Sequence, residues 1–215
     1  GVINVLSKSI DSANKISTNM GPNNYKNYKI RSGKQEDWSL DALFVNNDGF
    51  RDESGYDQQK AKFQSNFLLA SWNASLKAIL TNLNQETAGY VNGLNSYKDE
   101  NFSKQNFNPD AYRDANSQRI SLRLTKENDN TLYSITPYVR SNDMKFFQHF
   151  LPGTPLEENS HKSIGVVFQR ISEHGTFNLI RGLQIDLAKA ELTETQKNSL
   201  TDSSAFNNAT RPQGK

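Results

Sequence analysis

The sequence predicts an all-β protein, an antiparallel up-and-down transmembrane β-barrel with about nine strands in this chain. Hydrophobic residues make up only 34% of the 215 residues. A soluble domain usually has roughly 45–50% apolar residues, so an ordinary core would be thin here. Apolar and polar residues alternate with a period of two in many segments, as in strands with one apolar face. Aromatic residues gather near the ends of these segments, where the interfacial girdles of a membrane barrel would lie.

The strongest alternation lies at 38–44, 119–124, 133–140 and 177–187. The last of these segments is about eleven residues long, the length of a tilted membrane-spanning strand. Weaker alternation occupies 25–34, 63–69, 73–83 and 164–172. Pro137 counts against the strand at 133–140, because proline removes one donor from the hydrogen-bond ladder.

The connections between these segments alternate in length. Short polar turns at 33–36, 127–130 and 173–175 alternate with long loops at 46–57, 84–114, 149–161 and after Ala190. Short and long connections therefore fall on opposite edges of the sheet, as in barrels with tight periplasmic turns and long extracellular loops. Alternation alone also fits a soluble β-sandwich, whose outer faces meet water. The low hydrophobic content and the aromatic positions favour the barrel.

Composition excludes several other classes of protein. The 25 Lys and Arg residues nearly balance the 23 Asp and Glu residues, so the chain lacks the basic footprint of a nucleic-acid binder and no nucleic-acid partner is expected. The absence of cysteine excludes a disulfide framework, a Cys-ligated zinc site and a cysteine nucleophile. No apolar run approaches the ~20 residues that a membrane-spanning helix needs.

Two motifs resemble those of TonB-dependent outer-membrane receptors. Residues 1–8 read GVINVLSK, which is similar to the GVINVxTK segment that forms the last strand of the plug domain in that family, with Ser7 in place of the commoner threonine. Residues 47–57 read NDGFRDESGYD, which is similar to the xDGxRDxSxYD loop after the third barrel strand. Together with the order of turns and loops, the resemblance covers essentially the whole chain.

The resemblance implies that the chain is a fragment of a larger barrel. Residues 1–10 would be the C-terminal end of the plug domain, and residues 11–215 the N-terminal part of the receptor β-barrel. The resemblance places the protein in the outer membrane of a Gram-negative bacterium, in contact with membrane lipid and lipopolysaccharide. It implies binding and gated transport of a scarce ligand, most often a ferric siderophore, with energy from TonB acting through the missing N-terminal plug region. No enzymatic activity, cofactor or metal is expected.

Two groups of residues are the candidates for contact with a ligand. Alternate residues of the strands, Arg119, Arg123, Thr136, Tyr138 and Arg140, would face the interior if Ile120, Leu122 and Leu124 face lipid. These polar residues would contact plug carboxylates or an anionic ligand, or would simply line a wet wall. The expected loop at 146–161 could present a semi-rigid apolar surface above the interior, and its candidate ligand-binding residues are Phe146, Phe147, His149, Phe150 and His161.

Other motifs indicate weaker alternatives. The sequence from Ser12 to Lys15 matches the S-x-x-K pattern of serine acyl enzymes but lacks a K-T-G partner, so a serine hydrolase is a distant third hypothesis. The acidic residues of 48–57 could supply calcium ligands, although they depart from the EF-hand pattern and a solvated loop explains them as well. The three histidines match no metal-ligand spacing. The second hypothesis is a soluble secreted β-sandwich that binds carbohydrate through its aromatic loop residues.

Overall fold

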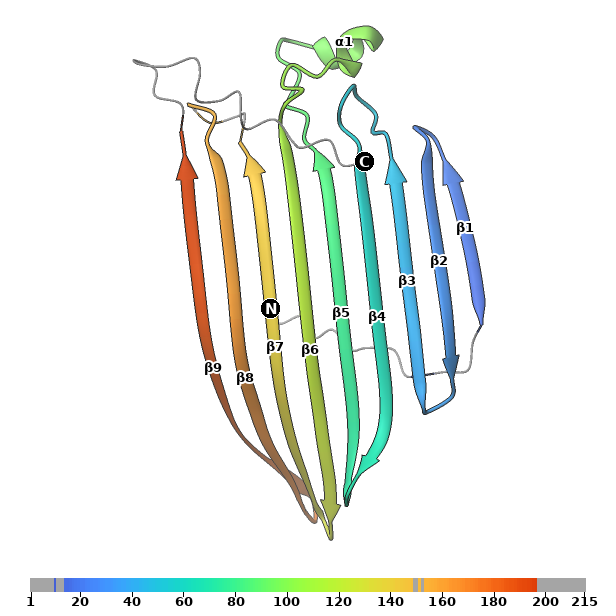
Figure 1. Ribbon diagram of the computed structural model, residues 1–215, viewed down its shortest axis with the longest axis vertical. Coiled ribbons are helices and arrows are strands. Elements are labelled where there is room, and N and C mark those ends of the chain that lie inside the picture. The colour runs from blue at the N-terminus through green and yellow to red at the C-terminus, as the bar shows by residue number, and fades with distance from the viewer. Residues whose placement is uncertain (1–9, 11–13, 149–150, 152, 197–215) are drawn as a thin grey trace.

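The computed structural model describes residues 10, 14–148, 151 and 153–196. These residues form one antiparallel sheet of nine strands, in which each strand pairs with its neighbours in the sequence (Figure 1). The predicted all-β, up-and-down class and the number of strands are confirmed. No pairing joins the first strand to the ninth within the described part of the chain, so closure into a barrel remains a prediction.

The strands lengthen along the chain, from 7 residues in the first to 19 in the last two. Their bounds are β1 Lys15–Gly21, β2 Tyr25–Lys34, β3 Trp38–Asn47, β4 Tyr56–Leu69, β5 Trp72–Glu86, β6 Tyr112–Asn128, β7 Thr131–Phe147, β8 Leu156–His174 and β9 Phe177–Thr195. A 3₁₀ turn, η1 (Ser96–Lys98), and a short helix, α1 (Glu100–Lys104), interrupt the connection between β5 and β6. Neither helical segment, nor any other in the described residues, has the length and apolar character to cross a membrane.

Several strands extend beyond the segments predicted from alternation. The expected loop at 149–161 is wrong in its extent, because β8 already begins at Leu156. The alternation pattern did not predict β1. It also predicted that β9 ends at about Leu187, although the strand continues to Thr195. In these parts polar residues occupy both faces, so the period-two signal disappears. Backbone pairing does not require apolar side chains, and the ladder therefore continues.

The predicted sorting of connections is present at the two edges of the sheet. The turns at 35–37, 70–71, 129–130 and 175–176 lie at one edge, and the longer connections at 48–55, 87–111 and 148–155 lie at the other (Figure 1). The connection at 22–24 is short although it lies at the long-loop edge. Each of the four tight turns contains a residue in the left-handed conformation that tight hairpin turns favour, namely Glu36 (φ 62°), Ala70 (φ 54°), Asp129 (φ 49°) and Gly175 (φ 58°).

Pro137 lies in the middle of β7 without ending it. Pairs between β6 and β7 are interrupted between Ser121–Tyr138 and Leu124–Ile135, which is the place of Pro137. Pairs between β7 and β8 run without a break through Pro137 and Val166. The proline therefore removes a short part of one ladder only, and the strand tolerates it.

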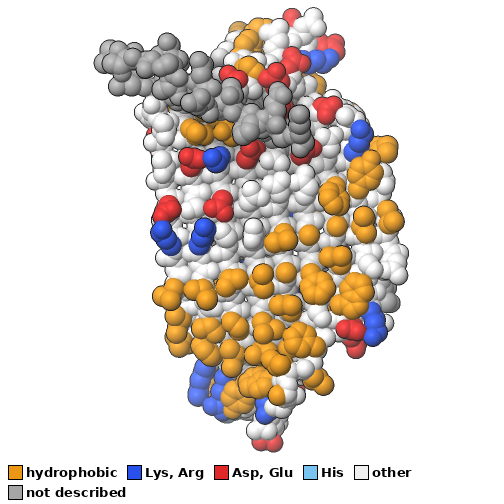
Figure 2. Space-filling view, in the orientation of Figure 1, with side chains coloured by type: hydrophobic (Ala, Val, Ile, Leu, Met, Phe, Trp, Pro, Cys, Tyr) orange, Lys and Arg blue, Asp and Glu red, His pale blue; other side chains and the backbone are white. Residues whose placement is uncertain are grey.

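The register sorts the strand residues onto two faces. One row crosses seven strands through Leu187, Ile164, Val139, Ile120, Ala78, Phe63 and Leu40. We call this side of the sheet the apolar face, and Figure 2 shows its hydrophobic residues as a continuous band. The band is exposed: Ile120 keeps 46% of its surface accessible and Leu187 keeps 69%. The alternate residues of each strand form the opposite side, which we call the polar face.

Candidate functional site

The polar face brings together the five residues that the sequence placed on one side of the strands. Arg119, Arg123, Thr136, Tyr138 and Arg140 alternate with apolar residues along β6 and β7, and Arg119 and Arg140 are directly opposite one another. The structure therefore places them on a common surface. That this surface lines the interior of a barrel remains a prediction.

Basic side chains dominate the middle of the polar face. Between the strand ends, the acidic residues on this face are Asp41 and Asp186. The remaining carboxylates of the face lie near the strand ends, at Glu127, Glu157, Glu173 and Glu194. The basic residues of the face, in strand order, are Lys15, Lys29, Arg31, Lys60, Lys62, Lys77, Arg113, Arg119, Arg123 and Arg140. This excess of positive charge is a property of one face, and the balanced composition of the chain conceals it.

Both acidic residues in the middle of the face are held in ion pairs. The Arg31 Nε atom lies 3.0 Å from Asp41 Oδ1 on the neighbouring strand. The Arg140 Nη2 atom lies 2.6 Å from Asp186 Oδ2, and Arg140 Nε donates a hydrogen bond of 2.6 Å to Ser163 Oγ. These two arginines are therefore compensated by neighbouring carboxylates within the sheet.

Tyr138 is the most enclosed aromatic residue of this surface, with 6% of its area exposed. The guanidinium carbons of Arg119 and Arg140 lie 5.6 and 5.8 Å from its ring centroid. Gln184 Nε2 on β9 donates a hydrogen bond of 3.1 Å to its hydroxyl oxygen. The ring faces Gly165 on β8, and this cluster joins β6 to β9 through side chains. The tyrosine was predicted for this face, but nothing in the local pattern identified Gly165 or Gln184 as its partners.

A second basic cluster on the polar face was not predicted. Lys62 on β4, Lys77 on β5 and Arg123 on β6 occupy three neighbouring strands. The residues directly opposite Lys77 are Gln64 and Ser121, so Lys62 and Arg123 lie on its two diagonals. Arg123 Nε donates a hydrogen bond of 3.4 Å to Ser134 Oγ. Among the described residues, no ion pair joins these three cations to a carboxylate.

A hollow of about 780 Å³ adjoins this second cluster. Lys77 and Arg123 contribute to its lining, together with hydroxyl groups of β5, β6 and β7. Those hydroxyl residues are Ser75, Ser121, Thr125 and Thr136. The hollow combines fixed positive charge with neutral donors, which is the combination that binds oxyanions.

The expected ligand-binding loop differs from the prediction. Phe146 and Phe147 belong to β7, so as consecutive strand residues they point to opposite faces. The ring of Phe147 stacks on Tyr112 with centroids 6.3 Å apart, and the guanidinium carbon of Arg113 lies 5.9 Å from the Phe146 centroid. His161 belongs to β8, opposite Asn142. His149 and Phe150 lie outside the described residues. Because β7 continues through both phenylalanines and pairs with β8, Phe146 and Phe147 lie on opposite faces of the sheet. They do not form the common aromatic surface that the sequence predicted.

Hydrogen bonds join the two long connections at 48–55 and 87–111. The guanidinium of Arg51 donates to the carbonyl oxygen of Gly89. The Asp52 amide donates to the Lys104 carbonyl at 2.9 Å, and Asn106 Nδ2 donates to the Glu53 carbonyl at 2.9 Å.

Within the described part of the chain, no group of three or more acidic or histidine side chains is arranged to hold a metal ion.

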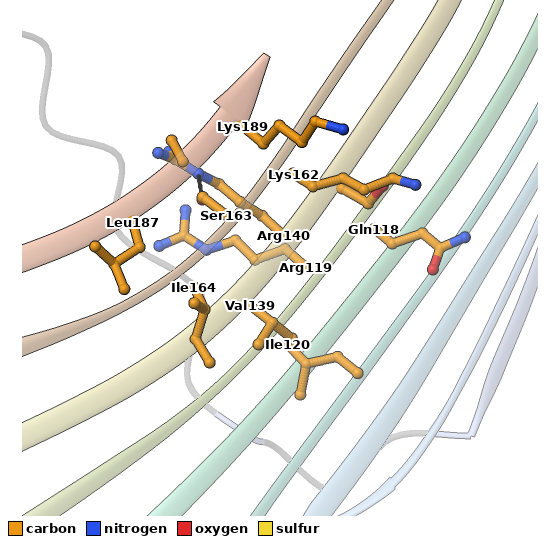
Figure 3. Close-up of a pocket in the computed structure, with 12 residues that line it drawn as sticks. Gln118, Arg119, Ile120, Val139, Arg140, Lys162, Ser163, Ile164, Leu187 and Lys189 are labelled. Carbon is orange, nitrogen blue, oxygen red and sulfur yellow. Dashed lines mark hydrogen bonds between the residues drawn. The ribbon is translucent and has the colours of Figure 1, made fainter. Parts of the chain in front are cut away.

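The apolar face carries a groove of about 540 Å³, which lies on the side of the apolar band that is nearer to the long-loop edge of the sheet. Ile120, Val139, Ile164 and Leu187 line it together with Lys162 and Lys189. Figure 3 shows the two lysines extending in the same direction from neighbouring strands. They are directly opposite one another in the β8–β9 ladder.

The same pair of strands carries a second pair of like charges. Arg170 on β8 is directly opposite Arg181 on β9, on the apolar face near the short-turn edge. Like charges directly opposite one another destabilise a sheet. Lys189 is partly compensated by Glu191, with Nζ and Oε1 2.5 Å apart, and Arg170 lies 5.6 Å from the ring centroid of Tyr133.

Comparisons with known proteins do not identify a family: no family model matches this chain, and a search of curated proteins finds no significant relative. The resemblance to TonB-dependent receptors therefore depends on the motifs at 1–8 and 47–57. Residues 1–8 lie outside the described part of the chain.

Proposed function

We propose that this sheet is part of the wall of an outer-membrane β-barrel, with its apolar face towards lipid and its polar face towards the interior. The observation that carries this proposal is the course of the apolar band across the strands. The row that contains Glu191 and Asp143 on β9 and β7 continues to Phe44 and Tyr28 on β3 and β2. The band therefore moves towards the long-loop edge as it crosses the sheet, as Figure 2 shows.

An oblique band is what a tilted barrel wall requires. Strands of membrane barrels are tilted by ~35–45°, while the hydrocarbon layer is flat. A band of constant height must then shift along successive strands. A sandwich core has no reason for such a shift, because its two sheets pack at nearly aligned angles. The described residues also form a single layer whose apolar face is not covered by a second sheet.

The two like-charged pairs lie on either side of the apolar band, and the distance between them along the strand fits the thickness of a membrane. Lys162 and Arg170 are separated by eight residues on β8, which is about 26 Å of extended strand at ~3.3 Å per residue. The apolar band of outer-membrane barrels is roughly 25 Å tall. Lys162, Lys189, Arg170 and Arg181 would then lie at the two headgroup layers, where anionic lipids offset their mutual repulsion.

Within this class we propose a TonB-dependent receptor that takes up a scarce ligand, with a ferric siderophore as the leading candidate. The support is the pair of motifs, together with the local geometry of the second one. Gly49 has φ +84°, and a Cβ atom there would lie 2.2 Å from Ser54 Oγ. A Cβ atom at Gly55 would lie 2.6 Å from the Asn47 carbonyl oxygen. Gly49, the glycine of the motif, is therefore needed for this compact loop, and Gly55, at an unspecified position of the motif, is needed as well.

Transport in this proposal involves binding and gating without covalent chemistry. Long connections at one edge would receive the ligand, and TonB would act through the plug. Growth on a ferric siderophore as sole iron source, compared between cells with and without the gene and with and without TonB, tests this part. Uptake that persists in the absence of TonB would contradict it.

The orientation of the sheet can be tested with adjacent labels on one strand. The 215 residues contain no cysteine, so Ser121→Cys and Leu122→Cys each place one nitroxide label within this part of the protein. In the full-length protein in bilayers, a label at 122 should be accessible to oxygen and protected from a water-soluble nickel chelate. A label at 121 should be accessible to the chelate.

The same experiment separates the competing architectures. Protection of position 122 from both reagents would indicate a buried sandwich core and would favour the carbohydrate-binding module. Access of the nickel chelate to position 122 would show that the apolar face meets water. Either result would overturn the membrane proposal.

A further inference from the structure

Three cations of the polar face have an arrangement that the barrel proposal does not explain. Lys62, Lys77 and Arg123 follow one another diagonally across β4, β5 and β6. Diagonal neighbours in a sheet are ~7–8 Å apart, which is within reach of long side chains. A generic polar lining would not need three neighbouring cations, and their repulsion favours a negatively charged partner.

Two other arginines of the same face have such a partner within the sheet. Arg31 is paired with Asp41, and Arg140 with Asp186. Around Lys77, however, the directly opposite residues are the uncharged Gln64 and Ser121. The described ion pairs of the polar face thus neutralise Arg31 and Arg140, and none of them joins this cluster of three neighbouring cations to a carboxylate.

The hollow beside the cluster has the size and the donors of a ligand site. Its volume of about 780 Å³ lies within the ~300–1,000 Å³ range of small-molecule sites. Lys77 and Arg123 would supply charge-assisted hydrogen bonds, and Ser75, Ser121 and Thr136 would supply neutral ones. One carboxylate residue, Glu36, also lines the hollow, from the turn between β2 and β3.

We propose that Lys77 and Arg123 form a binding site for a small polyanionic solute whose carboxylate or phosphate oxygens occupy the hollow. Lys62, diagonal to Lys77 on β4, adds positive charge from outside the lining of the hollow. This inference deepens the proposed function, because it names the chemical class of a solute that passes along or rests on the polar face. It depends on that function for the route of access only, since binding itself does not require transport.

The test measures binding of two polyanions to the purified full-length protein. Citrate and inorganic pyrophosphate are titrated calorimetrically at low ionic strength, with maltose as a neutral control. Lys77→Gln and Arg123→Gln should each weaken binding of the polyanions by at least tenfold. Lys60→Gln removes the same charge from the same face outside the lining of the hollow, and it should change the affinity by less than about twofold. Lys77→Arg keeps the charge and should retain most of the affinity.

Several results would overturn the inference. Absence of binding to the wild-type protein would exclude a polyanion site, and equal losses in the Lys77→Gln and Lys60→Gln variants would indicate non-specific attraction. Absence of binding combined with a lower melting temperature of Lys77→Gln would indicate that an acidic segment of the protein occupies the site. Heat-modified migration in electrophoresis verifies that each variant is folded.

The binding test and the labelling test examine different proposals, so a negative result in one does not decide the other. A sheet that is shown to face lipid on one side remains a barrel wall even if no polyanion binds. Conversely, a polyanion site remains valid if position 122 proves to be buried in a sandwich.

Discussion

The ring of Tyr138 on β7 lies over Gly165, the residue directly opposite it on β8. A Cβ atom at position 165 would lie 2.5 Å from the tyrosine hydroxyl oxygen and 2.8 Å from the carbonyl oxygen of Ile185. Any larger residue must therefore displace both the ring and the backbone of β9. The glycine weakens the strand by itself, but the aromatic ring covers the gap and links the two strands in one register.

Gly165→Ala should lower the free energy of unfolding by about 1–3 kcal/mol, because overpacking forces the ring and the backbone to shift. Urea refolding titrations of the full-length protein in detergent micelles measure this change. Gly182→Ala is the matched control on the next strand, where the nearest atom to the new Cβ would be the Phe168 carbonyl oxygen at 3.2 Å. A loss at position 165 no larger than at 182 would contradict the close packing of Tyr138 on Gly165.

Ile185→Arg should cost about 2–4 kcal/mol if the apolar face meets lipid, because Ile185 lies midway between Arg181 and Lys189 on β9. Leu183 is only two residues from Arg181, so the same change there should cost less. Ile180→Arg makes the identical substitution on the polar face and should be nearly neutral. Refolding into bilayers at increasing urea concentration provides the comparison, and equal costs at 180 and 185 would show that the faces are wrongly assigned.

Tyr112 and Phe147 should be coupled in stability. Their rings stack at 6.3 Å between centroids, and such pairs contribute about 0.5–1.5 kcal/mol beyond burial. A double-mutant cycle with Tyr112→Ala and Phe147→Ala should reveal this coupling in refolding titrations. Strictly additive losses would mean that the stack is not formed, and Phe147 would again be available to a ligand.

Gly49→Ala should loosen the loop at 48–55 without unfolding the sheet. The substitution is strained both by φ +84° and by contact with Ser54. Limited proteolysis of intact cells should therefore cut this loop faster in the variant, while heat-modified migration of the protein stays unchanged. Asp48→Ala, a neighbouring change without either conflict, serves as the control. Unchanged cleavage would show that the glycine is not required for the loop conformation.

The alternation of residue types was sufficient to predict the strands with a clear apolar face. In β6, the sequence Arg119-Ile120-Ser121-Leu122-Arg123 identifies both the strand and its two sides, because successive side chains of a strand point in opposite directions. The placement of short and long connections on opposite edges followed from the lengths of polar segments between strands. These are local properties, and each can be read from a few consecutive residues.

The ends of the strands and the composition of the candidate sites depend on pairing between distant residues. β1 contains only Ile16 and Met20 as large apolar residues, so its strand conformation depends on pairing with β2. Lys62, Lys77 and Arg123 become neighbours only through the register of β4, β5 and β6. Parity assigns each residue to a face, whereas register decides which residue lies beside it. A shift by two residues would keep every face and separate this cluster, because hydrogen-bond pairing across strands is non-local information that alternation does not contain.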